Sequence, residues 1–279
     1  MCSTLSNRGL TLVQLKREVR LTHTTDSGVI TTVDGLRTLF RIVATPTQDV
    51  DVSTVSIYNL SDNTAGALSI GDAIRLETRR VGEPYQRLFE SNIAGVRNIR
   101  EEADTLTEIT ISSLSLKQLA ISESFQGRQP LRQVVTGIIV DKAELELTGA
   151  HRLDGYQVDN AIVTGGTADA VNTLIAPYNL VAYQVGNQVR IYESGVSTTD
   201  TVRLINAESG MIGVPEITSE GVRVRIVLDG SIEPQHMVRI ASTRSPSANG
   251  DYRVVRIMHV GDTGNSPDWY TELDCNASS

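Results

Sequence analysis

The sequence predicts a mainly β fold with an α/β insert (α+β), in which two antiparallel, barrel-like β domains flank a small helix-plus-hairpin domain. Three observations predict this organisation. Residues 1–113 and 199–279 are rich in alternating apolar and polar residues, as half-buried strands are. Residues 114–198 contain two apolar stripes at helical spacing. The strands predicted in the last segment also follow the order of strands predicted in the first.

Composition sets the class of protein. The chain has 279 residues, of which 40% are hydrophobic and 21% charged, as in ordinary soluble proteins. No apolar run approaches the roughly 20 residues of a membrane helix, and the start lacks the apolar segment of a secretory signal. We therefore expect synthesis in a cytoplasm and no stable membrane association.

The charge balance argues against a dedicated nucleic-acid binder. The formal net charge is -8 and the pI about 5.1, whereas affinity for phosphates comes from clustered Lys and Arg. An acidic or neutral surface would, however, let DNA slide past without holding it.

The first segment contains a series of alternating β runs. The run with the most β-branched residues is Val52–Leu60. Ser61 is positioned to cap a single helical turn that ends near Leu68. The other strands are expected at Leu10–Leu15, Glu18–Thr22, Leu39–Val43, Ala73–Glu77, Leu88–Ile99 and Leu106–Ser112.

The character changes at Leu114. Residues 114–125 are interpreted as a connector, and Pro130 suits the first position of a helix. A second helix is expected after Gly165-Gly-Thr167. Residues 180–192 are typical of a hairpin that turns at Gly186-Asn187. These elements predict a compact α/β insert.

The C-terminal segment predicts a small antiparallel unit that echoes the first. Each has an alternating run, a turn, two further strands, a polar or acidic loop and a last strand. Gly71–Leu76 lies opposite Gln235–Ile240, and Ile93–Ile99 lies opposite Val254–Val260. Few residues are identical, and any two meanders share alternation and turn chemistry. Duplication and chance similarity both stay open on the residues alone.

No motif for catalysis, a metal or a cofactor stands out. Cys2 and Cys275 form no CxxC pair, which argues against a zinc or redox site. The four histidines have no HExxH or similar spacing. Gly165-Gly-Thr167 lacks the Lys of a phosphate loop, so a turn and helix cap is favoured. We expect no cofactor.

Charged positions point to surfaces instead of chemistry. Arg223 and Arg225 alternate with Val222 and Val224, so they face away from the apolar side of their strand. Glu101, Glu102 and Asp104 form an acidic cluster that is typical of a solvated hairpin tip.

Several stretches, taken together, resemble the baseplate hub, or tail-hub, proteins of contractile-tailed bacteriophages. Most of the chain takes part, and each stretch is short and carries no catalytic residue. One departure is Gln235, where the family tends to have glycine before the strand. The resembling stretches are Val55–Ser61, Ile70–Leu76, Ser124–Gly127, Ser209–Pro215, Glu220–Asp229, Met237–Ile240, Gly250–Asp262 and Trp269–Leu273.

The resemblance implies a non-enzymatic virion protein of the tail baseplate. It implies a homotrimer whose two tube-like β domains per subunit form a pseudo-sixfold ring. That ring would join the sixfold tail tube protein to the threefold central spike protein and would line the DNA channel. Tape measure and baseplate wedge proteins are further expected partners, DNA is only passing cargo, and assembly is expected in the bacterial host cytoplasm.

Under this reading, three features are expected to form interfaces. They are the acidic tip with Glu101, Glu102 and Asp104, and the strand face that carries Arg223 and Arg225. The third is the polar loop Gly261–Asp268, from which Gly261, Asp262, Asn265 and Asp268 are the candidate residues. The channel-facing surface is expected to be neutral to acidic.

Two alternatives remain open on the sequence. One is another tail adaptor or tube-terminal structural protein, which could also be β-rich and acidic. The other is a cell-wall-binding or hydrolytic tail module, although Trp and Phe are scarce and no convincing pair of catalytic carboxylates is found.

Overall fold

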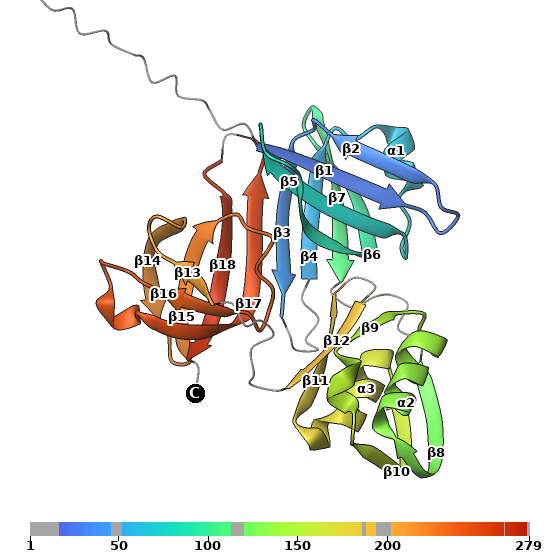
Figure 1. The fold of residues 1–279 in the computed structure, drawn as a ribbon. Coiled ribbons are helices and arrows are strands. Elements are labelled where there is room, and N and C mark those ends of the chain that lie inside the picture. Colours follow the sequence, from blue (N-terminus) through green and yellow to red (C-terminus); the bar gives the residue numbers. More distant parts are fainter. Residues whose placement is uncertain are drawn as a thin grey trace, which may run out of the picture.

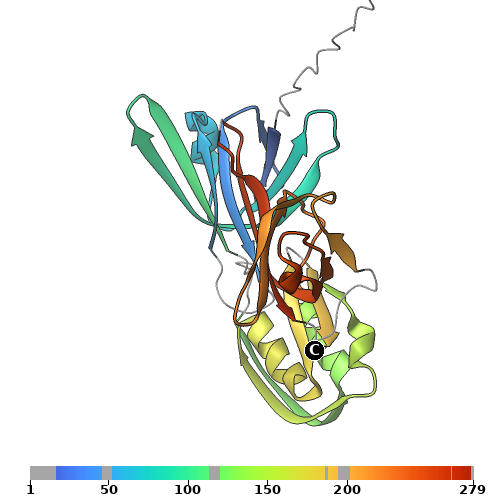
Figure 2. The ribbon, with the colours of Figure 1, turned by 90° about the vertical axis from the view of Figure 1, so that its left-hand side faces the viewer.

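The computed structural model describes residues 17–45, 52–112, 120–185, 188–193, 202–264 and 266–277. Strands dominate, and most of them belong to one 13-stranded sheet (Figure 1). The insert lies at one end of this sheet and carries the longest of the described α-helices (Figures 1 and 2). The predicted strand Leu10–Leu15, Cys2 and the predicted turn at Gly186-Asn187 lie outside the described residues.

The first half supplies seven strands and a short helix. Ser61 caps the helix as predicted, because its hydroxyl accepts a hydrogen bond from the Thr64 N–H at 3.2 Å. The elements are β1 (Arg17–Thr24), β2 (Ile30–Asp34), β3 (Thr38–Ala44), β4 (Val52–Tyr58), α1 (Asp62–Ala67), β5 (Ala73–Arg80), β6 (Gln86–Glu101) and β7 (Asp104–Ser112).

The C-terminal part supplies six strands. Their alternating residues bury one face and leave the other polar, as in β15, where Val222, Val224 and Ile226 are buried. The elements are β13 (Arg203–Ile205), β14 (Met211–Ile217), β15 (Gly221–Val227), β16 (Met237–Ile240), the 3-10 turn η4 (Pro246–Ala248), β17 (Gly250–Asp262) and β18 (Trp269–Ala277).

In the described residues the two β regions belong to one sheet, and no closed barrel is found among them. The strand order is β14-β15-β18-β17-β3-β4-β7-β6-β5-β1-β2, with β16 beside β17 and β13 beside β16. The bridge is the antiparallel pair β3–β17, which aligns Leu39 with Asp262 and Ala44 with Ile257. Sequence alternation could not show this pairing, because it identifies strands but not their neighbours across such a distance.

The predicted internal echo is present as a shared strand order. The first half contains β3-β4-β7-β6-β5-β1, and the second contains β14-β15-β18-β17-β16-β13. Five of the six strands keep their relative directions. The exception is the last, because β1 is antiparallel to β5 whereas β13 is parallel to β16. The extra strand β2, which follows β1, accounts for this reversal.

Local irregularities repeat as well. The β6–β7 register shifts between Ile93 and Gly95, and the β17–β18 register shifts between Val254 and Arg256. These shifts fall at the positions that the sequence alignment matches. Generic meander chemistry does not account for two sets of six strands that share both their order and the position of a bulge. The structure therefore favours an internal repeat over chance similarity.

The turn before each inner strand repeats in its hydrogen bonds. Gly71 N–H donates to Ile93 O, and Ile93 N–H donates to Asp72 O. In the second copy, the Gln235 N–H donates to Val254 O, and the Val254 N–H donates to His236 O. Gly71 has φ +97° and Gln235 has φ +71°, so Gln235 holds a backbone conformation that favours glycine. Glycine would therefore suit position 235, where this chain has glutamine.

The insert is more extensive than predicted. Both helices are found, and so is the pairing of β11 with β12. The segment 114–125 is wrong as a simple connector, because β8 begins at Ile121 and pairs with β10. The elements are β8 (Ile121–Pro130), α2 (Leu131–Thr136), the π turn η1 (Gly137–Lys142), β9 (Glu146–Thr148), η2 (Ala150–Leu153), β10 (Gln157–Gly165), α3 (Thr167–Ile175), η3 (Ala176–Tyr178), β11 (Leu180–Val185) and β12 (Gln188–Glu193).

Three hydrophobic clusters form the described core. One lies within the insert and contains residues from Ile121 to Ile191. The second lies in the first half, and the third contains residues from Ile205 to Cys275. Trp269 is an exception to this division, because it lies on β18 but packs in the cluster of the first half.

Candidate assembly surfaces

The β3–β17 pair is the seam between the repeats, and close packing holds it. Gly261 is buried under Phe40, and a Cβ at Gly261 would overlap the phenyl ring. Phe40 meets Trp269 edge to face, with ring centroids 5.6 Å apart. The geometry accounts for Gly261 by packing within one chain.

A polar cluster closes one end of the seam. The Arg37 guanidinium donates to both carboxylate oxygens of Asp262, with Nη2 3.0 Å from Oδ2, and lies over the Tyr58 ring. Burial alone would raise the pKa of Asp262, but the hydrogen bonds from Arg37 and from the Gly264 N–H outweigh it and lower the pKa. Asp262 is therefore an ionised, structurally engaged carboxylate.

The acidic tip lies near this cluster and is exposed. Tyr58 reaches Glu101, and the Asn59 amide donates to Asp104 at 2.9 Å. Glu102 holds φ +53° in the tight turn between β6 and β7. The structure thus brings Asp262 and the acidic tip into one neighbourhood through Arg37 and Tyr58, neither of which the sequence predicted as an interface residue.

The loop after β17 is organised by its own side chains. Asp268 O accepts from the Asp262 N–H at 3.0 Å, and the Asp268 carboxylate accepts from the Ser266 hydroxyl at 2.8 Å. Arg17 donates to Ser266 O and lies over Trp269. Asp268 is exposed, whereas Asn265 lies outside the described residues. β6 and β17 run in the same direction, so this loop and the acidic tip lie at the same end of the sheet.

Arg223 and Arg225 lie on the polar face of β15, as the alternation predicts. Each is bound by the neighbouring strand β18: Arg223 Nε lies 2.6 Å from Asp274 Oδ1, and Arg225 Nε lies 2.7 Å from Glu272 Oε2. Arg256 of β17 also contacts Asp274. The arginines are half exposed, so the face is a balanced ladder of alternating charge instead of a basic patch.

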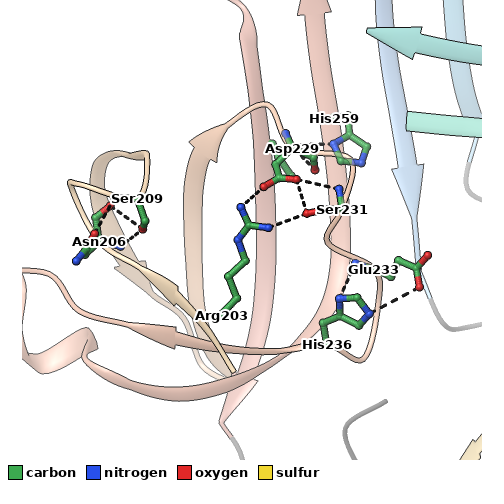
Figure 3. A network of polar contacts seen from close by, with 9 residues as sticks. Arg203, Asn206, Ser209, Asp229, Ser231, Glu233, His236 and His259 are labelled. Atoms are coloured by element: carbon green, nitrogen blue, oxygen red, sulfur yellow. Dashed lines mark hydrogen bonds and ion pairs between the residues drawn. The ribbon is translucent and has the colours of Figure 1, made fainter. Parts of the chain in front are cut away.

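A polar network holds the connection between β15 and β16 (Figure 3). Asp229 pairs with Arg203 and accepts from both the hydroxyl and the N–H of Ser231. The Glu233 N–H donates to His236 Nδ1 at 3.2 Å. This bond repeats the first half, where the Ser69 N–H donates to Asp72.

The same connection touches the insert. Glu233 pairs with Arg190 of β12, and a cavity of about 480 Å³ opens beside this pair, where the two repeats and the insert meet. Its walls include apolar Ile42, Leu88 and Ile257. The residues of two ion pairs, Arg190–Glu233 and Arg87–Glu90, line the cavity, and in each pair the charges neutralise one another within the chain. The cavity therefore lies at the contact between the two repeats and the insert.

Within the described ranges, no group of three or more His, Cys, Asp or Glu side chains is arranged to hold a metal ion. None of the helices in those ranges combines the length and apolar character that crossing a membrane requires. The buried Cys275 has its pKa raised by burial, which keeps it protonated as a small packing residue.

Comparisons with known proteins agree with this geometry. The chain resembles the 43 kDa tail protein of prophage MuSo2 from Shewanella oneidensis, with a TM-score of 0.67 and 8% identity over 94% of this chain and 98% of that one. It resembles a tail protein from Neisseria meningitidis MC58, with a TM-score of 0.64 and 7% identity over 92% and 96%. These identities establish a shared fold alone. No curated protein sequence matches.

The family comparison extends across both repeats and the insert. The model of the family described as "Baseplate hub gp41" matches residues 40–271, which is well over half of the chain. This family is one of structural baseplate proteins. Together with the fold shared with phage tail proteins, this match shows that the chain belongs to the baseplate hub gp41 family and is a structural protein of a phage tail baseplate.

Proposed function

We propose that the protein is the trimeric hub that joins the sixfold tail tube to the threefold central spike of a contractile tail. The observation that carries the proposal is the repeated six-strand order with its matching bulge and turn. Each repeat is then one tube-like β domain, within residues 1–113 and 199–279, and residues 114–198 form the insert domain. Three chains with two repeats each offer six similar units to a sixfold partner.

The two ends of the sheet suit partners of different symmetry. The acidic tip of β6–β7 and the loop 262–268 are counterparts in the two repeats and lie at one end. A trimer would present six such loops, which suits the tail tube protein. The insert occurs once per chain and lies at the opposite end (Figure 1), so a trimer would present three inserts, which suits the central spike protein.

The remaining parts of the proposal follow from this placement. The ring surrounds the channel through which DNA passes, and the channel surface is neutral to acidic. Tape measure and baseplate wedge proteins contact the ring during assembly, which takes place in the bacterial host cytoplasm. The protein works without catalysis or a cofactor.

Native mass and cryo-electron microscopy of the purified protein test the proposal. We expect three chains of 30.3 kDa, about 91 kDa in total, and a ring in which the two repeats alternate around one axis. A stable particle of six copies would favour a tube-terminal protein instead. Repeats that do not alternate around a common axis would contradict the pseudo-sixfold arrangement.

A further inference from the structure

The longest strand of each repeat, β6 in the first and β17 in the second, differs in how much of one edge is paired with other strands. In β17, residues 250–253 pair with β16, and residues 257–262 pair on the same side with β3. In β6, residues 86–92 pair with β5. The described structure places no strand on that side of residues 96–101, which pair only with β7. One repeat therefore has a filled edge and the other has the same edge open.

β3, which fills the edge of β17, has a counterpart in β14, whose outer edge has no paired strand in the described structure. β3 begins the hairpin β3–β4, and β14 begins the equivalent hairpin β14–β15. The register matches Ile42 with Ile217 and Arg41 with Glu216 once the irregular Gly213–Pro215 is allowed for. Ile42 is 1% exposed, whereas Ile217 is 56% exposed. The same position is thus buried where the seam is formed and open where it is not.

We propose that β14 of one copy pairs antiparallel with residues 96–101 of β6 in the next copy, and so repeats the seam that β3 and β17 form within the chain. By this equivalence, Glu216 aligns with Ile99, and Ile217 aligns with Asn98. Six strands separate β14 from β6 in the same chain, a distance of roughly 30 Å across a sheet. β14 therefore does not reach this edge within its own chain, and the equivalence with the β3–β17 seam points to a second copy of the chain.

Apolar surface fits this pairing, whereas charge is balanced on the open edge. Glu216 is largely exposed, with Arg223 at 3.8 Å. On the face of Ile99, Arg97 pairs with Glu108 and Glu101 lies two residues further along the strand. Ile212, Val214 and Ile217 are the exposed apolar residues of β14. The kink at Gly213–Pro215 makes β14 a poor template for indiscriminate edge pairing. Pairing of this kind is head to tail, so it closes into a ring if the rotation permits.

The proposal rests on the hub function only for the number of copies, and cysteine cross-linking tests the seam itself. Glu216→Cys and Ile99→Cys are introduced together in a chain that also carries Cys2→Ser and Cys275→Ala. After oxidation we expect covalent dimers and trimers on a non-reducing gel. The matched control is Arg41→Cys with Val260→Cys, which are aligned within one chain and should give an internal disulfide without covalent oligomers.

A second pair of variants tests the same edge without disulfides. Ile217→Lys should shift the native mass from trimer to monomer with an unchanged circular dichroism spectrum. Ile162→Lys, at a residue 73% exposed on the insert, should leave the trimer intact.

The outcomes separate the seam from the hub function. A trimer by native mass without the Glu216–Ile99 cross-link would overturn the seam and leave the hub function standing. A six-copy particle that cross-links would support the seam and overturn the trimer. A protein that stays monomeric at high concentration would overturn both.

Discussion

Gly261 has a packing role within the chain that the sequence did not indicate. Its place before a polar loop predicted an interface, and its lack of a side chain admits Phe40 into the seam. We predict that Gly261→Ala destabilises the protein by about 1–3 kcal/mol or more through overpacking, measured by urea unfolding. Gly66→Ala is the control, because nothing lies within 4 Å of its added Cβ. Phe40→Leu in the Gly261→Ala background should restore part of the loss; no recovery would point to another cause.

His259 gives the protein a pH-dependent element of stability. It is buried, and Nδ1 lies 2.8 Å from Thr271 Oγ1. Burial lowers its pKa from 6.5 to about 4, and the Asp229 carboxylate offsets this only in part. Between these values the unfolded chain binds a proton that the folded chain does not, so stability falls as the pH falls through this window.

The expected loss from pH 6.5 to pH 4 at this residue is about 3 kcal/mol at most. Unfolding by urea at several pH values measures it. His259→Gln, whose amide can still meet Thr271, should show a flatter profile than the wild type over this window. His151→Gln, at an exposed histidine, should keep the wild-type slope. Equal slopes for the wild type and His259→Gln would refute the assignment.

At the scale of elements, alternation predicted the strands whose faces differ in burial. β7 and β15 have such faces and were found close to the expected limits. β8 was missed because most of its residues are exposed on a two-stranded ribbon, which leaves no apolar period to detect. The β3–β17 pairing was missed for a different reason: residues that align across it are more than 200 positions apart, and no local pattern encodes such a neighbour.

The repeated turn shows which features of an element persist when its residues change. Asp72 and His236 occupy the same position, and each accepts a hydrogen bond from the N–H three residues earlier. In the first half, Asp72 also contacts the buried His23 at 2.6 Å. In the second, His236 has its pKa lowered mainly by burial, which favours the neutral form that can accept a bond at Nδ1. The backbone geometry is shared, while the acceptor of the turn's hydrogen bond is a carboxylate in the first repeat and an imidazole in the second.

The candidate surfaces were predictable only as far as charge and exposure are local. Arg223 and Arg225 were correctly placed on the polar face, and the acidic tip was correctly placed on a hairpin turn. Arg37, which joins Asp262 to the neighbourhood of that tip, gave no signal because its partner lies 225 residues away. The sequence therefore predicted where charges are exposed, and the fold determined which of them act together.

For the whole molecule, the two repeats are expected to unfold as one body and the insert to be separable from them. Trp269, the single tryptophan, reports on this because it lies on β18 yet packs in the core of the first half. Val55 and Val224 are counterparts buried in the two repeats, and Leu153 is buried in the insert core. We predict that Val55→Ala and Val224→Ala each lower the stability reported by Trp269 fluorescence by about 2 kcal/mol, in a single transition. Leu153→Ala should leave this transition in place and lower the stability reported by amide exchange within residues 120–193.

If Val224→Ala moved only a transition that Trp269 does not report, the shared sheet would not couple the repeats, and the two units would be independent domains.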